Sequence, residues 1–158
     1  MHERAVEFRE RAREEYGFDV DVHEFPEGTK TAADAADAVG CDVAQIASSL
    51  VFRAGDDLVV VVTSGANRVS ESKLASLRDV DESDVSMADA DAIRSTLGWS
   101  IGGVPPFCHD SDLTVYLDET LTGFDTVWGA AGTPEAVFPL DPDTLRELSG
   151  ATVADVTE

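Results

Sequence analysis

The segment from Gly98 to Asp110, with the sequence GWSIGGVPPFCHD, holds the residues best suited to binding chemistry. Gly102 and Gly103 can adopt positive φ and let a ligand approach the backbone closely. The two prolines that follow fix φ and donate no hydrogen bonds, so we expect a stiff loop. The amides of Gly102, Gly103 and Val104 are then free to donate to a bound carbonyl or ribose oxygen. The same composition also suits a turn that merely joins a helix to a strand.

Three side chains in and before this loop could act on a substrate. Cys108 and His109 could form a thiolate–imidazolium pair, but adjacent residues of an extended chain point to opposite sides and seldom form a dyad. His109 serves equally well as a loop histidine with purely structural hydrogen bonds. Ser48 is a weak candidate nucleophile because its neighbours supply no base, and a small residue entering a sheet explains it better.

The composition indicates one globular domain. The chain has 158 residues, 43% of them apolar, which is enough for a hydrophobic core. No apolar run approaches the ~20 residues that span a bilayer, and the N-terminus lacks an apolar signal core. Two cysteines, Cys41 and Cys108, make neither a disulfide framework nor a zinc site. We therefore expect a cytoplasmic protein with no cofactor, no metal and no membrane partner.

The net charge is strongly negative. The chain carries 32 Asp and Glu residues against 11 Lys and Arg residues, a formal charge of −21. The acidic residues interrupt periodic segments rather than forming a block, and such a surface is typical of proteins that work in concentrated salt. We expect a halophilic protein of haloarchaeal type, and the charge by itself assigns no function.

The elements that must position the loop can be predicted from caps and periodicity. Apolar residues at helical spacing predict a helix over 2–16, and the valine run at 58–62 predicts a strand covered on both faces. The mixture of helices and strands without a strict alternation predicts an α/β (α+β) domain with helices packed on a mixed sheet. Further helices are expected after Thr31, Asp42, Ser70, Asp89 and Asp141, and strands at 49–53, 58–63, 85–87, 113–117, 126–130 and 136–140.

The order of short motifs along the chain resembles the YbaK/prolyl-tRNA synthetase-associated domain family from about residue 20 to the C-terminus. Each motif is weak alone, and their order makes the resemblance specific. The motifs are TAADAADAVGC at 31–41, QIASSLVF at 45–52, VTSG at 62–65, the loop at 98–109, VYLDETL at 115–121 and AGT at 131–133.

This resemblance implies a single curved, mixed sheet over residues 1–158, with an N-terminal helix at 1–18 and the family core at 20–158. It implies aminoacyl-tRNA editing, which is hydrolysis of the ester between a wrong amino acid and the terminal adenosine of a tRNA. The loop would surround the aminoacyl carbonyl. The catalytic candidates are then Gly102, Gly103, His109 and Ser48, and the substrate-binding candidates are Lys30, Thr31, Ser64, Gly65, Val104, Pro106, Phe107, Asp118, Gly132 and Thr133.

The chain departs from the family pattern at two positions. Ser48 stands where the family usually has an active-site lysine, and serine supplies no charge to a phosphate or an ester. Lys30 is the candidate to replace that charge. Cys108 stands where a glycine is usual.

Three functions follow as alternatives. The favoured one is a deacylase for a small amino acid such as alanine or cysteine, with tRNA-Pro as one candidate tRNA. Its partners would be the acceptor end of a mischarged tRNA and an aminoacyl-tRNA synthetase, without DNA. The second is a non-catalytic module of the same fold that binds tRNA ends or a synthetase, and the third is an unrelated hydrolase that uses Cys108. Because tRNA contacts are usually made by Lys and Arg, tRNA recognition by so acidic a chain would depend on short-range contacts at high salt.

Overall fold

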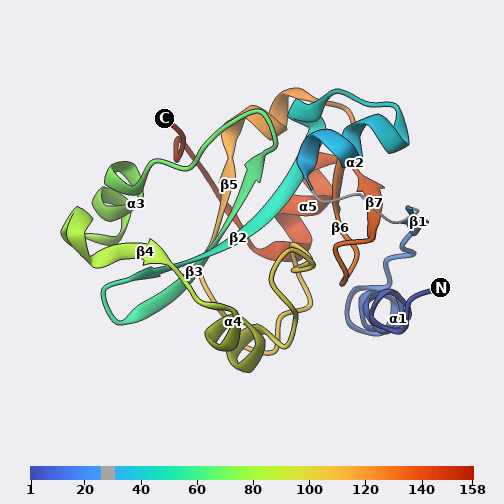
Figure 1. Cartoon of the computed structure of the whole chain (residues 1–158), viewed down its shortest axis with the longest axis horizontal. Coiled ribbons are helices and arrows are strands. Elements are labelled where there is room, and N and C mark those ends of the chain that lie inside the picture. Colours follow the sequence, from blue (N-terminus) through green and yellow to red (C-terminus); the bar gives the residue numbers. More distant parts are fainter. Residues whose placement is uncertain (26–30) are drawn as a thin grey trace.

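A long β-hairpin forms the centre of the sheet in the computed structural model, which describes residues 1–25 and 31–158 (Figure 1). Its strands are β2 (Ile46–Ala54) and β3 (Asp57–Ser64). The strands predicted at 49–53 and 58–63 are confirmed, and both extend beyond the predicted ranges. In this register Ser48 lies opposite Thr63, at the end of the hairpin far from the turn.

The remaining strands extend this hairpin into the predicted mixed sheet. The order is β1-β7-β6-β2-β3-β5-β8, and β4 pairs with a separate part of β2. Pairs β2–β6, β3–β5 and β5–β8 are parallel, and the others are antiparallel. The strands are β1 (His23–Glu24), β4 (Val85–Met87), β5 (Val115–Asp118), β6 (Val127–Ala130), β7 (Ala136–Leu140) and β8 (Thr152–Ala154).

The predicted helix caps are confirmed. The side chains of Thr31, Ser70, Asp89 and Asp141 each accept a hydrogen bond from a backbone N–H in the first turn of the helix that follows. The helices are α1 (Glu3–Tyr16), α2 (Ala32–Val39), α3 (Glu71–Arg78), α4 (Ala90–Leu97) and α5 (Pro142–Ser149), and the short 3₁₀ helices are η1 (Val43–Gln45), η2 (Glu82–Asp84) and η3 (Glu119–Gly123).

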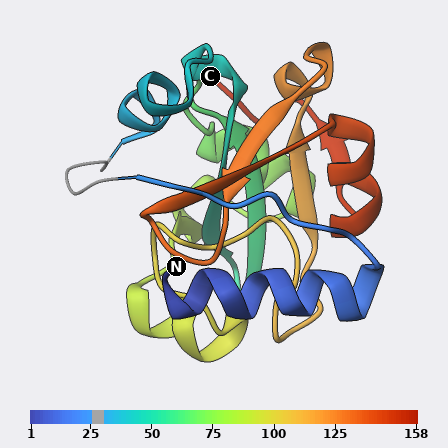
Figure 2. The same ribbon diagram turned by 90° about the vertical axis from the view of Figure 1, so that its right-hand side faces the viewer.

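The sheet is covered on both faces, as the valine run predicts. Val60 and Val62 pack into the core beneath α1, α4 and α5, whereas Val59 and Val61 pack toward α3 on the other face. A third apolar cluster joins α2 to Ile46. Figure 2 shows α1 along one side of the molecule and α2 near the opposite end. Among the described residues, no helix is both long and apolar enough to cross a membrane.

Candidate functional site

One edge of β2 is left open in the middle of the strand. On this edge β6 pairs only with Ile46 and Ala47, and β4 pairs only with Phe52–Ala54 (Figure 1). The Ala88 N–H donates to the Val51 carbonyl oxygen at 3.0 Å just before the β4 ladder. Within the described part of the chain, no strand therefore pairs with this edge between these two ladders.

The backbone of Ser49 faces this gap. Successive residues of a strand direct their N–H and C=O groups to opposite edges. The Val51 carbonyl oxygen accepts from Ala88 and the Gly55 N–H donates to Asp84, so odd-numbered residues of β2 face the open edge. Ser49 consequently presents an N–H donor and a C=O acceptor to whatever occupies the gap.

A cavity of about 220 Å³ fills the gap. None of its described lining residues is charged, and its polar side-chain groups are the hydroxyls of Thr31, Ser48 and Ser49 and the indole N–H of Trp128. The apolar side chains of Met87 and Ile101 line it while remaining 54% and 52% exposed, so they mark its mouth. The lining residues are Thr31, Ala32, Ala35, Ile46, Ala47, Ser48, Ser49, Leu50, Val51, Met87, Ile93, Ile101, Gly102, Val104, Trp128, Ala130, Pro134, Ala136 and Val137.

Unpaired polar groups surround this apolar cavity. Among the described residues, the N–H groups of Gly102 and Val104 have no hydrogen-bond acceptor, and both residues line the cavity. The Ser49 hydroxyl is buried and also lacks a partner. Buried polar groups are nearly always paired, so the unpaired Ser49 hydroxyl and the amide of buried Val104 point to a missing ligand, whereas Gly102 is exposed and its N–H is open to solvent. These donors suit an oxygen atom that carries or develops negative charge.

The structure differs from the sequence expectation at Gly103. Its N–H donates to the Ser100 carbonyl oxygen at 3.0 Å and closes a turn, so this amide is occupied. A Cβ at Gly103 would lie 2.7 Å from Thr133 Cα, which explains the need for glycine through close packing. Gly102 has φ of +85°, as expected for a loop glycine. The free amides are consequently those of Gly102 and Val104.

Ser48 and Thr31 lie at the cavity, as the sequence suggested. The Thr31 hydroxyl also accepts from the Asp34 N–H as the cap of α2. Lys30 lies outside the described residues.

His109 and Cys108 line a different cavity, of about 270 Å³, together with Tyr16. His109 Nε2 donates to the Pro105 carbonyl oxygen at 2.7 Å. Burial lowers the pKa of His109, so the imidazole is neutral at neutral pH. The structure thus places His109 as a support of the loop rather than at the cavity of Gly102.

The thiol of Cys108 is unsuited to nucleophilic chemistry. Burial raises its pKa to about 12, so the thiol stays protonated. Cys108 has φ of +65°, in the left-handed region that favours glycine. This conformation gives a physical reason for the glycine that is usual at this position.

Asp118 lies away from the cavity, at the end of β5. It is fully buried and accepts hydrogen bonds from the Ser64 N–H at 3.0 Å, from Asn67 at 3.0 Å and from the Thr120 N–H at 2.9 Å. Burial alone would raise the pKa of Asp118, but these hydrogen bonds outweigh burial and lower it. Asp118 thus fixes the ends of two strands.

The other expected binding residues mainly serve packing. The Ser64 hydroxyl donates to the Ala44 carbonyl oxygen at 2.7 Å, and a Cβ at Gly65 would lie 2.6 Å from a backbone oxygen. Phe107 is buried among the aromatic rings of the core. Pro106 packs against Gly129, Gly132 lies against α1, and buried Thr133 packs against Gly103.

Sequence reasoning missed Ser49. The available signal was the pair of adjacent serines in an otherwise apolar strand. Adjacent residues of a strand point to opposite faces of the sheet, so a single solvent-exposed face cannot account for both Ser48 and Ser49. The open edge itself depends on where β4 and β6 end on β2, which no local pattern shows.

Several known proteins share sequence with this chain. The family model described as "Aminoacyl-tRNA editing domain" matches residues 26–148. The chain is 34% identical over 134 residues to the uncharacterized protein YwhH of Bacillus subtilis, covering 84% of this chain and 83% of that protein. It is 33% identical over 101 residues to the proline–tRNA ligase of Limosilactobacillus fermentum, covering 61% of this chain but only 17% of the ligase.

A solved structure shows the same fold over nearly the whole chain. It is the crystal structure of a candidate trans-editing enzyme for prolyl tRNA synthetase, with 40% identity and a TM-score of 0.90. The match covers 98% of this chain and 97% of the other. Together with the family match, this likeness shows that the chain belongs to the aminoacyl-tRNA editing domain family.

Proposed function

We propose that this protein is an aminoacyl-tRNA deacylase that hydrolyses the ester of a mischarged tRNA carrying a small, uncharged amino acid. Alanine and cysteine are the first candidates, with tRNA-Pro as a candidate tRNA. The observation that carries the proposal is the pair of unpaired amides of Gly102 and Val104 beside an apolar cavity. The family of the chain supports the same reaction class.

The proposed reaction needs no ionisable side chain as an acid, a base or a nucleophile. Water adds to the ester carbonyl, the carbonyl oxygen becomes an oxyanion, and the bond to the ribose oxygen then breaks. The amides of Gly102 and Val104 would donate to that oxyanion, a contribution that strengthens in the transition state. The proton of the attacking water would pass to the departing ribose oxygen, helped by the neighbouring ribose hydroxyl. The hydroxyls of Ser48 and Ser49 would orient the water and the substrate.

The open edge of β2 would recognise the amino group of the substrate. The described lining of the cavity contains no carboxylate that could pair with an ammonium group. The Ser49 carbonyl oxygen and the hydroxyls of Ser48 and Ser49 would accept hydrogen bonds from it. Hydrogen bonds of this kind complete an unpaired strand edge, so the ligand would take the place of a missing strand.

The terminal nucleotide would lie at the mouth of the cavity, against the exposed side chains of Met87 and Ile101. With Ser48 in place of the family lysine, Lys30 is the candidate that supplies positive charge there. The acidic surface supports action at high salt in the cytoplasm of a halophile, where repulsion of tRNA is screened. An aminoacyl-tRNA synthetase is the candidate partner.

A second candidate function is a non-catalytic module that holds tRNA ends. It is favoured by Ser48 and by the lack of any ionisable side chain among the described lining residues.

Deacylation of a panel of mischarged tRNAs in concentrated KCl separates the two candidates. A deacylase releases the amino acid from at least one tRNA at a rate above spontaneous hydrolysis. A binding module protects the ester or leaves its rate unchanged. N-acetylated alanyl-tRNA is the matched substrate control, because it lacks the ammonium group from which Ser49 would accept a hydrogen bond.

A further inference from the structure

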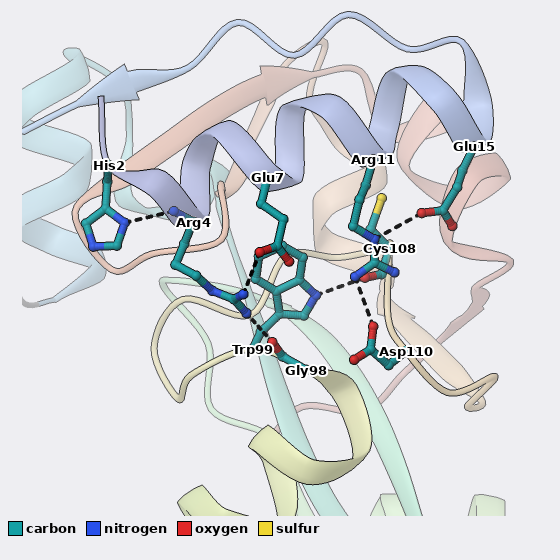
Figure 3. A network of polar contacts seen from close by, with 9 residues as sticks. All are labelled: His2, Arg4, Glu7, Arg11, Glu15, Gly98, Trp99, Cys108 and Asp110. Atoms are coloured by element: carbon teal, nitrogen blue, oxygen red, sulfur yellow. Dashed lines mark hydrogen bonds and ion pairs between the residues drawn. The ribbon is translucent and has the colours of Figure 1, made fainter.

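The N-terminal helix α1 lies beside the Gly98–Asp110 loop, and its Arg4 and Arg11 side chains point toward the loop (Figure 3). This helix precedes the residues that match the family model, and the cavity lining does not include it. It nevertheless contacts both ends of the loop that carries the free amides. Arg4 binds the start of the loop and Arg11 binds its end.

Arg4 makes two contacts with the start of the loop. Its guanidinium donates to the Gly98 carbonyl oxygen, and its Cζ lies 4.3 Å from the centroid of the Trp99 ring. A second nitrogen of the guanidinium donates to Glu7 at 2.8 Å, which fixes the side chain on the helix. A cation over an indole ring gains most when the pair is shielded from water, and Trp99 is fully buried.

Arg11 and a backbone hydrogen bond hold the other end of the loop, at Asp110. Arg11 pairs with Asp110 at 3.0 Å and with Glu15 at 3.1 Å, and its Cζ lies 5.6 Å from the Trp99 ring centroid. The Asp110 N–H donates to the Leu97 carbonyl oxygen at 3.1 Å, so the two ends of the loop lie side by side.

Trp99 connects these contacts to the interior of the loop. Its indole N–H donates to the Cys108 carbonyl oxygen at 2.9 Å, across the loop. Phe8 of α1 packs edge-on against Trp99 and also contacts Phe107. The loop therefore cannot shift without breaking contacts to α1.

The turn after β6 packs against both α1 and the loop. A Cβ at Gly132 would lie 2.7 Å from the Arg4 carbonyl oxygen and 2.8 Å from the Trp99 ring. The next residue of the turn, Thr133, packs on Gly103. The free amides of Gly102 and Val104 thus sit on a loop that contacts both α1 and this turn.

We infer that Arg4 and Arg11 are positioning residues of the editing site, which set the placement of the Gly102 and Val104 amides by clamping the loop through Gly98, Trp99 and Asp110. The inference rests on the proposed function, since it assigns these amides a catalytic part. Oxyanion donors contribute fully only when they are held in place before the reaction, and small displacements far from the chemistry reduce turnover strongly.

The test compares Arg4→Ala with Arg13→Ala. Arg13 lies on the same helix, pairs with Asp19 at 2.8 Å and is 72% exposed, so it matches Arg4 in type but not in contacts. Hydrogen exchange of peptides covering 98–110 measures the stability of the loop. Exchange of peptides from β2 and β3 measures the stability of the sheet. The kcat and KM of deacylation report on the editing site.

For Arg4→Ala we expect exchange of the loop peptides to rise about tenfold, with exchange in β2 and β3 unchanged. We expect kcat to fall by about tenfold or more, while KM changes by less than about twofold. Arg4→Lys, which retains the charge, should restore much of kcat. Arg13→Ala should match the wild type in both readouts.

Three results would overturn the inference: unchanged exchange in the loop, faster exchange with unchanged kcat, or equally faster exchange throughout the sheet. Should Arg4→Ala fail to fold, Arg11→Gln allows the same comparison, because it removes the pairs with Asp110 and Glu15 while filling most of the space. If the wild type deacylates no tRNA, the proposed function fails, and the exchange data still decide whether α1 clamps the loop.

Discussion

The Gly103 N–H donates to the Ser100 carbonyl oxygen at 3.0 Å, so the Gly103 amide is not free to donate to a ligand. This hydrogen bond closes a turn at the tip of the loop and leaves the amides on either side of Gly103 without acceptors among the described residues. Glycine at position 103 serves close packing on Thr133, and the donors of the site are Gly102 and Val104. The predictions below test this arrangement and the residues around it.

Ser49→Ala separates function from stability. The Ser49 hydroxyl is buried without a partner, so removing it should leave the free energy of unfolding unchanged or raise it by up to about 1 kcal/mol. Deacylation should nevertheless fall by about tenfold, because the substrate loses a hydrogen bond. Urea denaturation and single-turnover kinetics provide the two measurements. Ser95→Ala on α4 is the control, and a loss of stability without a loss of activity in Ser49→Ala would contradict the assignment.

His109→Gln tests whether His109 only supports the loop. A glutamine can still donate to the Pro105 carbonyl oxygen, so we expect deacylation within about threefold of the wild type. A loss of about a hundredfold would instead assign His109 a catalytic part.

The same variant has a predicted effect on the pH dependence of stability. Because the pKa of His109 is lowered in the folded state, the unfolded state takes up the proton first as the pH falls below about 6.5. The wild type should therefore lose up to about 1.4 kcal/mol per pH unit between that value and the folded pKa. His109→Gln should lack this loss, which denaturation at pH 7.5 and pH 5.5 would measure.

Cys108→Ala tests the alternative of a cysteine hydrolase. With a pKa of about 12 and full burial, Cys108 should resist thiol reagents in the native protein at pH 8. Mass spectrometry after treatment with iodoacetamide would locate the labelled cysteine. We expect deacylation by Cys108→Ala within about twofold of the wild type, whereas its abolition with an intact fold would revive the alternative.

The sequence predicts most elements of the fold because their signals are local. Side-chain caps such as Thr31 and Asp141, and the valine run of β3, each mark an element without any knowledge of its neighbours. The strands β1 (two residues) and β8 (three residues) were missed, since neither has an alternating apolar pattern of its own. Their pairing depends on strands far away in the chain.

The site could be predicted only in part, for the same reason. The composition of the loop predicts a backbone-donor segment, and Ser48, a candidate from its position in the motif order, lies at the cavity. The use of the Gly103 amide, the open edge beside Ser49 and the separate cavity of His109 all arise from tertiary contacts. No spacing in the sequence encodes them.

Comparing Val104→Pro with Val104→Ala tests the central claim most directly. Proline removes the backbone N–H, whereas alanine shortens the side chain and retains the donor. With the mischarged tRNA that the wild type hydrolyses best, Val104→Ala should retain kcat within about threefold. Val104→Pro, if its thermal unfolding shows an intact fold, should lose about a hundredfold in kcat. Equal rates for the two variants would contradict the assignment of the Val104 amide as an oxyanion donor.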